Sequence, residues 1–274
     1  MRAGFLEALL AAGLAMHKAE PVADGRLHRY QVEGDKSGSK NGWYVLHPGD
    51  NPSGMFGSWR TGQSETWTPT SLQAMSRAER GTLVARMAEA KQARDIEQAA
   101  VHASARARAL RLWEKSKPAF GDHAYLLRKA VPAYGIRLLR EQLVVPLRDV
   151  DGVLHSLQFI GPDGRKTFLT GGRKRGCYLP IGRPDAALCI CEGYATGASI
   201  YQATGHATAV AFDTSNLKPV ALALRQKFPR LTLVIAGDND LQTSNNPGVR
   251  AATAAAHAVG AALAIPSFSG MPHA

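Results

Sequence analysis

The chain has 274 residues, 45% of them hydrophobic, and a formal net charge of +11 at pH 7. This length can bury one or two hydrophobic cores, so we expect two units, and the composition excludes a disordered chain. No apolar stretch approaches the ~18 residues that a membrane-spanning helix needs, so no contact with a membrane is expected.

The three cysteines indicate an intracellular, cytoplasmic protein. Cys189 and Cys191 lie two residues apart in an apolar run, and Cys177 stands alone. Because no C-x-x-C pair occurs, the pattern indicates neither a disulfide framework nor a zinc ribbon. We therefore expect buried free thiols that act as small apolar residues, and no bound zinc.

The positive charge is concentrated in the first half of the chain. Residues 1–140 hold 21 Lys and Arg against 13 Asp and Glu, whereas residues 186–274 hold 5 against 4. Such an excess favours a surface for a polyanion, because Lys and Arg that contact phosphates release counterions. The alternative is that these cations lie on solvated helix faces. We expect the first half to hold single-stranded nucleic acid.

Residues 1–70 predict a small N-terminal α+β region. An amphipathic helix is expected over residues 5–16, where Glu7 interrupts the apolar run that a signal peptide would need. Residues 27–32 and 43–46 predict strands in a glycine-punctuated segment. Aromatic residues gather here beside bases, which suits either a single-strand stacking surface or the core of a small sheet. They are Trp43, Tyr44, Phe56, Trp59 and Trp67, beside Lys36, Lys40 and Arg60.

Residues 71–117 predict one long basic linking helix. Ser76 and Glu79 have the spacing of a capping box, and no proline follows until Pro118. The apolar stripe is thin, so the helix is expected to be partly solvent-bridging. That stripe consists of Leu83, Val84, Met87, Ile96, Val101, Leu110 and Trp113.

Residues 118–185 predict an α+β subdomain. A short helix over residues 122–129 precedes strands at 143–148, 154–160 and 166–169. The glycine-flanked loop at residues 171–176 carries three adjacent cations, Arg173, Lys174 and Arg175. Glycines let a backbone approach phosphates, so the loop suits an anion, although an exposed basic loop without a ligand has the same pattern.

Residues 186–274 predict an α/β domain with a mostly parallel sheet. Apolar runs at 187–191, 207–212 and 231–236 alternate with helical stretches at 194–203 and 217–228, and a last strand is expected near 262–266. This β-α-β-α-β order favours parallel strands with right-handed crossovers. Ligands of such sheets bind at the carboxyl ends of the strands.

Three carboxylates follow the ends of two predicted strands. Glu192 comes directly after the first apolar run, and Asp238 and Asp240 come after the third. Converging carboxylates repel one another unless a cation joins them, and hard oxygen ligands suit Mg²⁺ or Mn²⁺. Acidic residues at strand ends can also merely cap helices or form turns. The combination of E-G with D-x-D in one unit favours a metal site.

This constellation resembles the Toprim domain, the metal-binding module of bacterial (DnaG-type) primases, topoisomerases and some nucleases. The resemblance rests on Glu192-Gly193, on Asp238 and Asp240, and on the order of the elements. Cys-Glu-Gly-Tyr-Ala-Thr-Gly at 191–197, Asp-Asn-Asp at 238–240 and Asn-x-x-Gly at 245–248 are similar to plasmid- and phage-encoded primases.

The resemblance implies roles for particular residues. Glu192, Asp238 and Asp240 would be the catalytic and metal-binding residues, with Glu192 either a metal ligand or the general base. The strands at 143–169 resemble the segment that precedes Toprim in primases. Residues that would contact nucleotide or template are then Arg148, Lys166, Arg173, Lys174, Arg175 and Gly193.

The expected function is that of a primase-type nucleotidyltransferase of a plasmid, phage or mobile element. It would make short primers on single-stranded DNA from nucleoside triphosphates by metal-dependent phosphoryl transfer. The resemblance also allows a replicative helicase as a partner. Two alternatives stay open: a Toprim nuclease, and a non-catalytic accessory protein that binds single-stranded nucleic acid. Two departures from the family, the expected absence of a zinc module and of a C-terminal extension, give weight to the accessory protein as an alternative.

Overall fold

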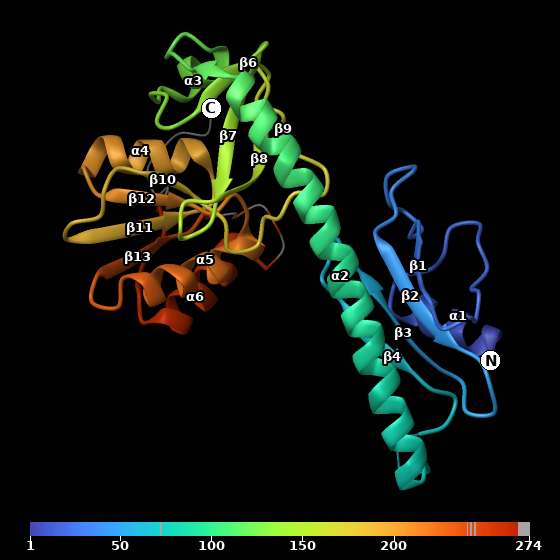
Figure 1. Ribbon diagram of the computed structural model, residues 1–274. Helices are drawn as coiled ribbons and strands as arrows, with labels where there is room; N and C mark the ends of the chain where they lie inside the picture. The colour runs from blue at the N-terminus through green and yellow to red at the C-terminus, as the bar shows by residue number, and fades with distance from the viewer. Residues whose placement is uncertain (72, 240, 242, 244, 268–274) are drawn as a thin grey trace. The chain divides into compact units, whose positions relative to one another are not determined.

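The structure, a computed structural model, describes residues 1–71, 73–239, 241, 243 and 245–267. The chain forms two compact units, Met1–Ala100 and Val101–Ala274, and helix α2 (Arg77–Lys115) continues from the first into the second (Figure 1). The described part contains no helix of the length and apolarity that crossing a bilayer requires. The finer division into residues 1–70, 71–117, 118–185 and 186–274 stays a proposal.

The first unit is built on a four-stranded antiparallel sheet in the order β1-β2-β3-β4. One helix precedes it and the first part of α2 follows it. The elements are α1 (Arg2–Ala11), β1 (Leu27–Tyr30), β2 (Gly42–His47), β3 (Ser53–Ser58) and β4 (Ser64–Trp67). The sequence predicted α1, β1 and β2 but neither β3 nor β4.

Both faces of this sheet are covered, which explains why β2 is buried along most of its length. On one face Tyr44 and Phe56 pack against Phe5 of α1. On the other face Arg94 of α2 lies 5.0 Å from the ring centroid of Trp43. Trp43, Tyr44 and Phe56 are each at most 3% exposed. Of the two interpretations of the aromatic cluster, the sheet core is therefore the one that holds for these three residues.

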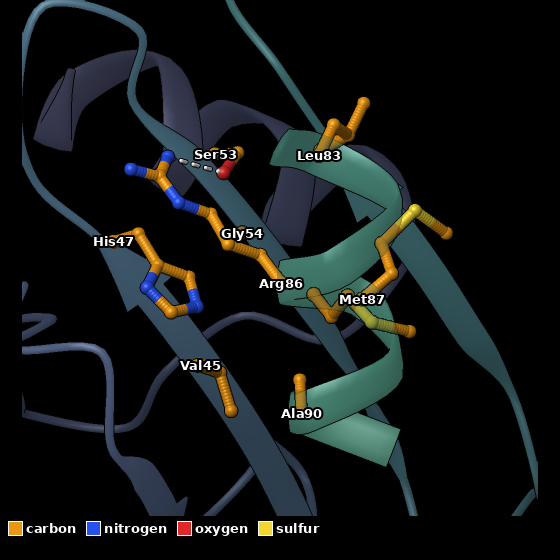
Figure 2. A pocket seen from close by; sticks show the side chains of 9 residues that line it. Val45, His47, Ser53, Gly54, Leu83, Arg86, Met87 and Ala90 are labelled. Carbon is orange, nitrogen blue, oxygen red and sulfur yellow. Dashed lines mark hydrogen bonds between the residues drawn. The ribbon is translucent and has the colours of Figure 1, made fainter. Parts of the chain in front are cut away.

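A small pocket in the first unit lies between β2, β3 and α2 (Figure 2). Arg86 crosses it and donates hydrogen bonds to the Ser53 hydroxyl (3.2 Å) and the Asn51 carbonyl oxygen (3.0 Å). His47 faces the same space, and burial followed by the charge of Arg86 lowers its pKa. These hydrogen bonds join α2 to the start of β3.

Helix α2 begins with the predicted capping box. The Ser76 N–H donates to the Glu79 carboxylate (2.7 Å), and the Glu79 N–H donates to the Ser76 hydroxyl (3.3 Å). The predicted apolar stripe is partly wrong, because Val84 and Ile96 are more than 60% exposed. The buried residues of α2 are Leu83 and three alanines, and small residues such as alanine let the helix approach its neighbours closely. The fully or nearly buried alanines are Ala90, Ala105 and Ala109.

The second unit contains two five-stranded sheets, of which the first is antiparallel in the order β5-β6-β7-β8-β9. Val144 and Leu157 of this sheet pack against Ala109 of α2. Its elements are β5 (Lys117–Pro118), α3 (Ala124–Lys129), β6 (Arg137–Leu139), β7 (Gln142–Arg148), β8 (Leu154–Ile160) and β9 (Lys166–Phe168).

The second sheet has the order β10-β12-β11-β13-β14, with β10 antiparallel to β12 and the other neighbours parallel. The predicted α/β fold class, with a mostly parallel sheet flanked by helices, is therefore confirmed. Its elements are β10 (Leu179–Ile181), β11 (Ala187–Cys191), α4 (Tyr194–Thr204), β12 (Ala207–Val210), α5 (Thr214–Lys227), β13 (Thr232–Ala236), α6 (Pro247–Val259) and β14 (Ala262–Ala264). The sequence predicted neither α6 nor β10.

Helices cover both faces of the parallel sheet, α4 on one and α5 with α6 on the other (Figure 1). Alternate residues of β11 point to opposite faces, so Ile190 packs towards α5 and α6 while Cys191 packs towards α4. Burial on both faces accounts for the continuous apolar run of β11. All three cysteines are buried free thiols, as predicted.

The two sheets of the second unit share one core. Tyr194 at the start of α4 is 1% exposed and packs with residues of α3 and β7. Its hydroxyl donates to the Pro132 carbonyl oxygen (2.7 Å) and accepts from the Tyr134 N–H (2.7 Å). This side chain therefore joins the parallel sheet to the segment between α3 and β6.

Candidate active site

Two of the three predicted catalytic carboxylates follow neighbouring parallel strands. Cys191 at the end of β11 is paired with Ala236 at the end of β13. Glu192 is the next residue after β11, and Asp238 comes two residues after β13, so both lie at the carboxyl edge of the sheet. Asp240, the third predicted member, lies outside the described residues.

Lys166 brings a cation from the antiparallel sheet to this edge. Its ammonium would lie 3.8 Å from a side chain added at Gly193. Desolvation by neighbouring protein atoms, and then the charge of Lys129, lower the pKa of Lys166. The charges of Asp238 and Glu192 raise it, and the net direction is downward. More than a third of the Lys166 side chain is nevertheless open to solvent. The structure therefore brings together Glu192, Asp238, Lys166 and Gly193.

Gly193 is the N-cap residue of α4 and has an extended backbone. A side chain there would make only ordinary contacts, with the Thr196 hydroxyl at 3.6 Å and with Lys166 at 3.8 Å. A methyl group would therefore fit beside the backbone at this position. Gly197, one turn further on, has a steric role instead, because an added carbon would come within 2.6 Å of Val210.

A further carboxylate at the edge, Asp213, was missed by sequence reasoning. Its position follows from the pairing of β12 with β11, which sets Val210 beside Cys191. Asp213 caps α5 by accepting from the Asn216 N–H (3.1 Å), and it forms an ion pair with Lys174. The signal was available, because an Asp before Thr-Ser-Asn after an apolar run is typical of a helix N-cap.

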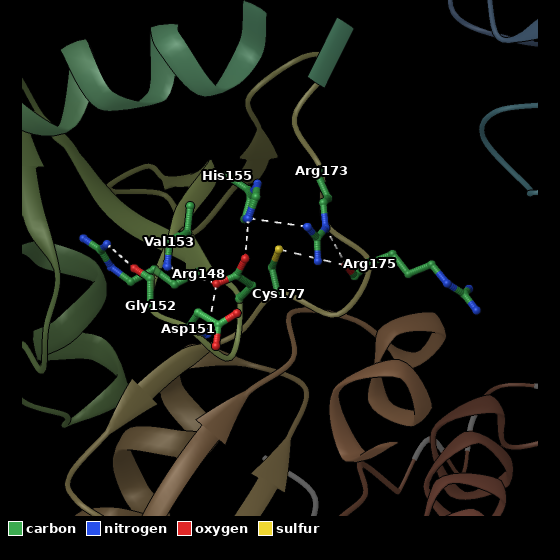
Figure 3. A network of polar contacts seen from close by, with 9 residues as sticks. Arg148, Asp151, Gly152, Val153, His155, Arg173, Arg175 and Cys177 are labelled. Atoms are coloured by element: carbon green, nitrogen blue, oxygen red, sulfur yellow. Dashed lines mark hydrogen bonds and ion pairs between the residues drawn. The ribbon is translucent and has the colours of Figure 1, made fainter. Parts of the chain in front are cut away.

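The three cations of the 171–176 loop have different surroundings. Lys174 lies at the carboxyl edge with Asp213, and Arg175 is exposed. Arg173 instead points to His155, with 3.4 Å between its Nη1 and the His155 Nε2 (Figure 3). His155 is in turn 2.7 Å from the Asp149 carboxylate. Figure 3 shows Arg173 and Arg175 extending in different directions.

Asp149 anchors this polar network. Burial raises its pKa, but the hydrogen bonds from His155 and from the Val153 N–H outweigh burial, and the net direction is downward. Both side chains of the Asp149–His155 pair are about one-seventh exposed, at 15% and 14%. The Asp149–His155 pair therefore lies beside Arg173, whose Nε–H donates to the Arg175 carbonyl oxygen (3.3 Å) at the base of the loop.

Arg148 lies away from the two described carboxylates. It donates to the Gly152 carbonyl oxygen (2.8 Å) and lies 5.6 Å from the ring centroid of Trp113 in α2. Burial, and then the charge of Arg137, lower its pKa. The structure thus does not bring Arg148 together with Glu192 and Asp238.

The segment after β13 is held by backbone packing and amide contacts. An added side-chain carbon at Gly237 would come within 2.5 Å of the Ala252 side chain, so close packing requires glycine. Asn239 donates to the Pro266 carbonyl oxygen (2.9 Å) and accepts from the Asn246 amide (2.8 Å). Asn246 also caps α6 by accepting from the Val249 N–H. Asp238 is therefore flanked by two residues with defined contacts, Gly237 and Asn239.

The donor chemistry of the edge suits a hard cation. Glu192 and Asp238 offer carboxylate oxygens from rigid strand ends, which is the kind of ligand that Mg²⁺ and Mn²⁺ prefer. Among the described residues, no group of three His, Cys, Asp or Glu side chains forms a complete metal site. The two described carboxylates are of the kind that holds such a cation, and Asp240, the third predicted ligand, lies outside the described residues.

Comparisons with known proteins agree on the region and on the kind of protein. The family model described as "Toprim domain" matches residues 187–266. Two proteins named DNA primase TraC from Escherichia coli are 38% and 37% identical to the chain, over 98% and 97% of its length. The chain spans only 20% and 26% of the length of these two relatives.

A solved structure of the DnaG primase catalytic domain bound to single-stranded DNA is 15% identical, with a TM-score of 0.35 over 49% of this chain and 46% of that one. So low a TM-score carries no argument about the fold. The match at residues 187–266 covers Glu192 and Asp238, and the two sequence relatives extend over both units. Residues 187–266 thus match the Toprim domain, and nearly the whole chain is similar to part of the two proteins named DNA primase TraC.

Proposed function

We propose that the chain is a primase-type nucleotidyltransferase, which makes short primers on single-stranded DNA from nucleoside triphosphates. One observation carries the proposal: Glu192, Asp238 and Lys166 meet at one edge of a Toprim sheet. The similarity to DNA primase TraC supports it. We place the protein in the cytoplasm, and we include a replicative helicase as a proposed partner.

The carboxylates would hold Mg²⁺ or Mn²⁺. Glu192 and Asp238 supply two ligand groups, and Asp240 is the proposed third. When bound, the ion would neutralise charge that develops on the triphosphate and on the attacking oxygen. Glu192 has two possible roles at this position, ligand or acceptor of the proton from the attacking hydroxyl. Both roles need its negative charge.

The cations of the edge would bind and orient phosphates. Lys166 lies beside Gly193, where the absence of a side chain lets a ligand approach the backbone. Lys174 is fixed by Asp213, and Arg175 is exposed and can reach a phosphate further out. The roles of Arg148 and Arg173 stay predictions, because their side chains contact Trp113 and His155 respectively.

A primer-synthesis assay on single-stranded DNA with labelled nucleotides and Mg²⁺ or Mn²⁺ tests the proposal. Glu192→Gln and Asp238→Asn should each lower incorporation by ~10²–10⁴-fold, because neither amide carries the required charge. Asp163→Asn is the matched control. This exposed turn residue accepts a hydrogen bond from the Arg165 N–H, through an oxygen that asparagine retains, and from no other group in the described ranges. Its activity should equal that of the wild type.

The products separate the proposal from its alternatives. Metal-dependent shortening of the DNA without primer synthesis would identify a nuclease that uses the same carboxylates. A wild-type protein that neither extends nor cleaves, yet binds single-stranded DNA, would identify an accessory protein. Either result would refute the proposed primase activity.

A further inference from the structure

An exposed aromatic ring lies on the strand that carries Lys166. Phe168 is 38% exposed and stands at the end of β9, the edge strand of the antiparallel sheet. Side chains two residues apart on a strand point to the same face, so Phe168 and Lys166 share one face of β9. That face is directed to the carboxyl edge of the parallel sheet, where Lys166 meets Gly193. The proposed function gives this ring no role.

Phe212, in the segment between β12 and α5, packs against this ring. The two ring centroids are 6.2 Å apart, in an edge-to-face arrangement with an interplanar angle of 79°. Phe212 has a φ of 77°, a left-handed conformation that is an outlier for a bulky residue. Its N–H donates to the Glu192 carbonyl oxygen (2.7 Å), which ties the strained residue to the catalytic candidate.

The strained backbone of Phe212 indicates that its aromatic side chain has a role that glycine or asparagine could not fill. Glycine or asparagine would adopt this backbone at little cost, whereas in other residues such a conformation is strained and is found mostly at functional sites. The Phe212 ring is 8% exposed, so one part of it belongs to the core. Its contact with Phe168 extends that core to an aromatic pair at the solvent boundary.

A cation completes the surroundings of the exposed ring. The Lys174 ammonium lies 5.1 Å from the Phe168 centroid and is held by Asp213. Phe168 therefore has two lysines nearby, Lys166 two residues away on its own strand and Lys174 on the 171–176 loop. An exposed aromatic ring beside cations is the combination with which proteins bind single-stranded nucleic acid, stacking on the base and pairing with the phosphate.

We propose that Phe168 stacks on a nucleobase at the carboxyl edge, while Lys166 and Lys174 contact the phosphates of the same nucleotide. This inference rests on the proposed function and specifies its ligand: a base from the DNA strand or from a nucleoside triphosphate. A single ring between two lysines is too small and too polar for a protein-binding surface, which needs a larger apolar patch.

Direct binding measurements in EDTA test the inference without catalysis. The variants are Phe168→Leu, which removes the π-face, and Phe168→Trp, which retains one. Phe120→Leu is the matched control, because Phe120 is 71% exposed and lies between β5 and α3. The probes are a short oligothymidylate, an abasic strand of equal length, ATP, and ribose 5-triphosphate. Melting temperatures verify that every variant is folded.

Phe168→Leu should weaken binding of at least one base-bearing probe by about 5- to 100-fold, which is the loss of affinity expected when one base–aromatic stack is removed. Binding of the matching base-free probe should stay unchanged, and Phe168→Trp should bind like the wild type. A loss confined to oligothymidylate assigns the base to the strand, and a loss confined to ATP assigns it to the nucleotide. Either result supports the inference.

Two results would overturn it: equal affinity of Phe168→Leu and wild type for both base-bearing probes, or an equal loss for the base-free probes. Because nothing is polymerised in EDTA, failure here is distinct from failure of the proposed function. A chain that stacks a base on Phe168 but makes no primers would retain the inference and refute the primase activity. A primase indifferent to Phe168→Leu would do the reverse.

Discussion

Removal of one hydroxyl group, by Tyr194→Phe, should weaken the junction between the two sheets of the second unit. The hydroxyl makes two hydrogen bonds of 2.7 Å, to the Pro132 carbonyl oxygen and from the Tyr134 N–H. A buried polar group left without its partner costs ~1–3 kcal/mol. Tyr134 is half-buried, so water can partly replace its partner, and we expect a total loss of about 2–3 kcal/mol.

For a unit of this size each kcal/mol lowers the melting temperature by ~2–4 °C, which gives a decrease of about 4–12 °C. Urea unfolding can be monitored through the hydrogen exchange of peptides from residues 101–274. This measures the loss of unfolding free energy in the second unit alone. Tyr201→Phe is the matched control, since the Tyr201 hydroxyl makes no hydrogen bond within the described part of the chain and its ring contact with Tyr134 is kept. Equal stability of Tyr194→Phe and Tyr201→Phe would refute the reasoning.

Three further predictions concern metal, packing and pH. Mg²⁺ should raise the melting temperature of the wild type but not of Asp238→Asn, and equal shifts would contradict a metal role for Asp238. Gly237→Ala should cost ~1–3 kcal/mol in urea unfolding, because its carbon would meet Ala252 at 2.5 Å, whereas Gly81→Ala, in an open helical position, should not destabilise. Burial raises the pKa of Cys177 from 9.0 to about 11, so the folded state holds the proton more tightly. Its contribution to stability is full below pH 9 and lost by pH 11, and Cys177→Ala should flatten that decline.

Local patterns in the sequence predicted most elements of the parallel sheet and the edge at which Glu192 and Asp238 lie. The continuous apolar runs of β11 and β13 predicted strands buried on both faces, and such strands occur in parallel sheets under helices. Strand direction then assigned Glu192 and Asp238 to one edge, because parallel strands end on the same side. The capping box of α2 was readable for the same reason: its hydrogen bonds join residues three apart.

Only the tertiary structure decided which distant side chains meet at that edge. Lys166 reaches Gly193 from a different sheet, Asp213 takes Lys174 as its partner, and Phe168 meets Phe212. It also decided that Trp43 belongs to a core and that Ile96 does not. Composition and periodicity describe neighbours along the chain, whereas these contacts depend on how separate elements pack. A cation or an aromatic residue has the same local pattern whether it faces solvent, a core or a catalytic edge.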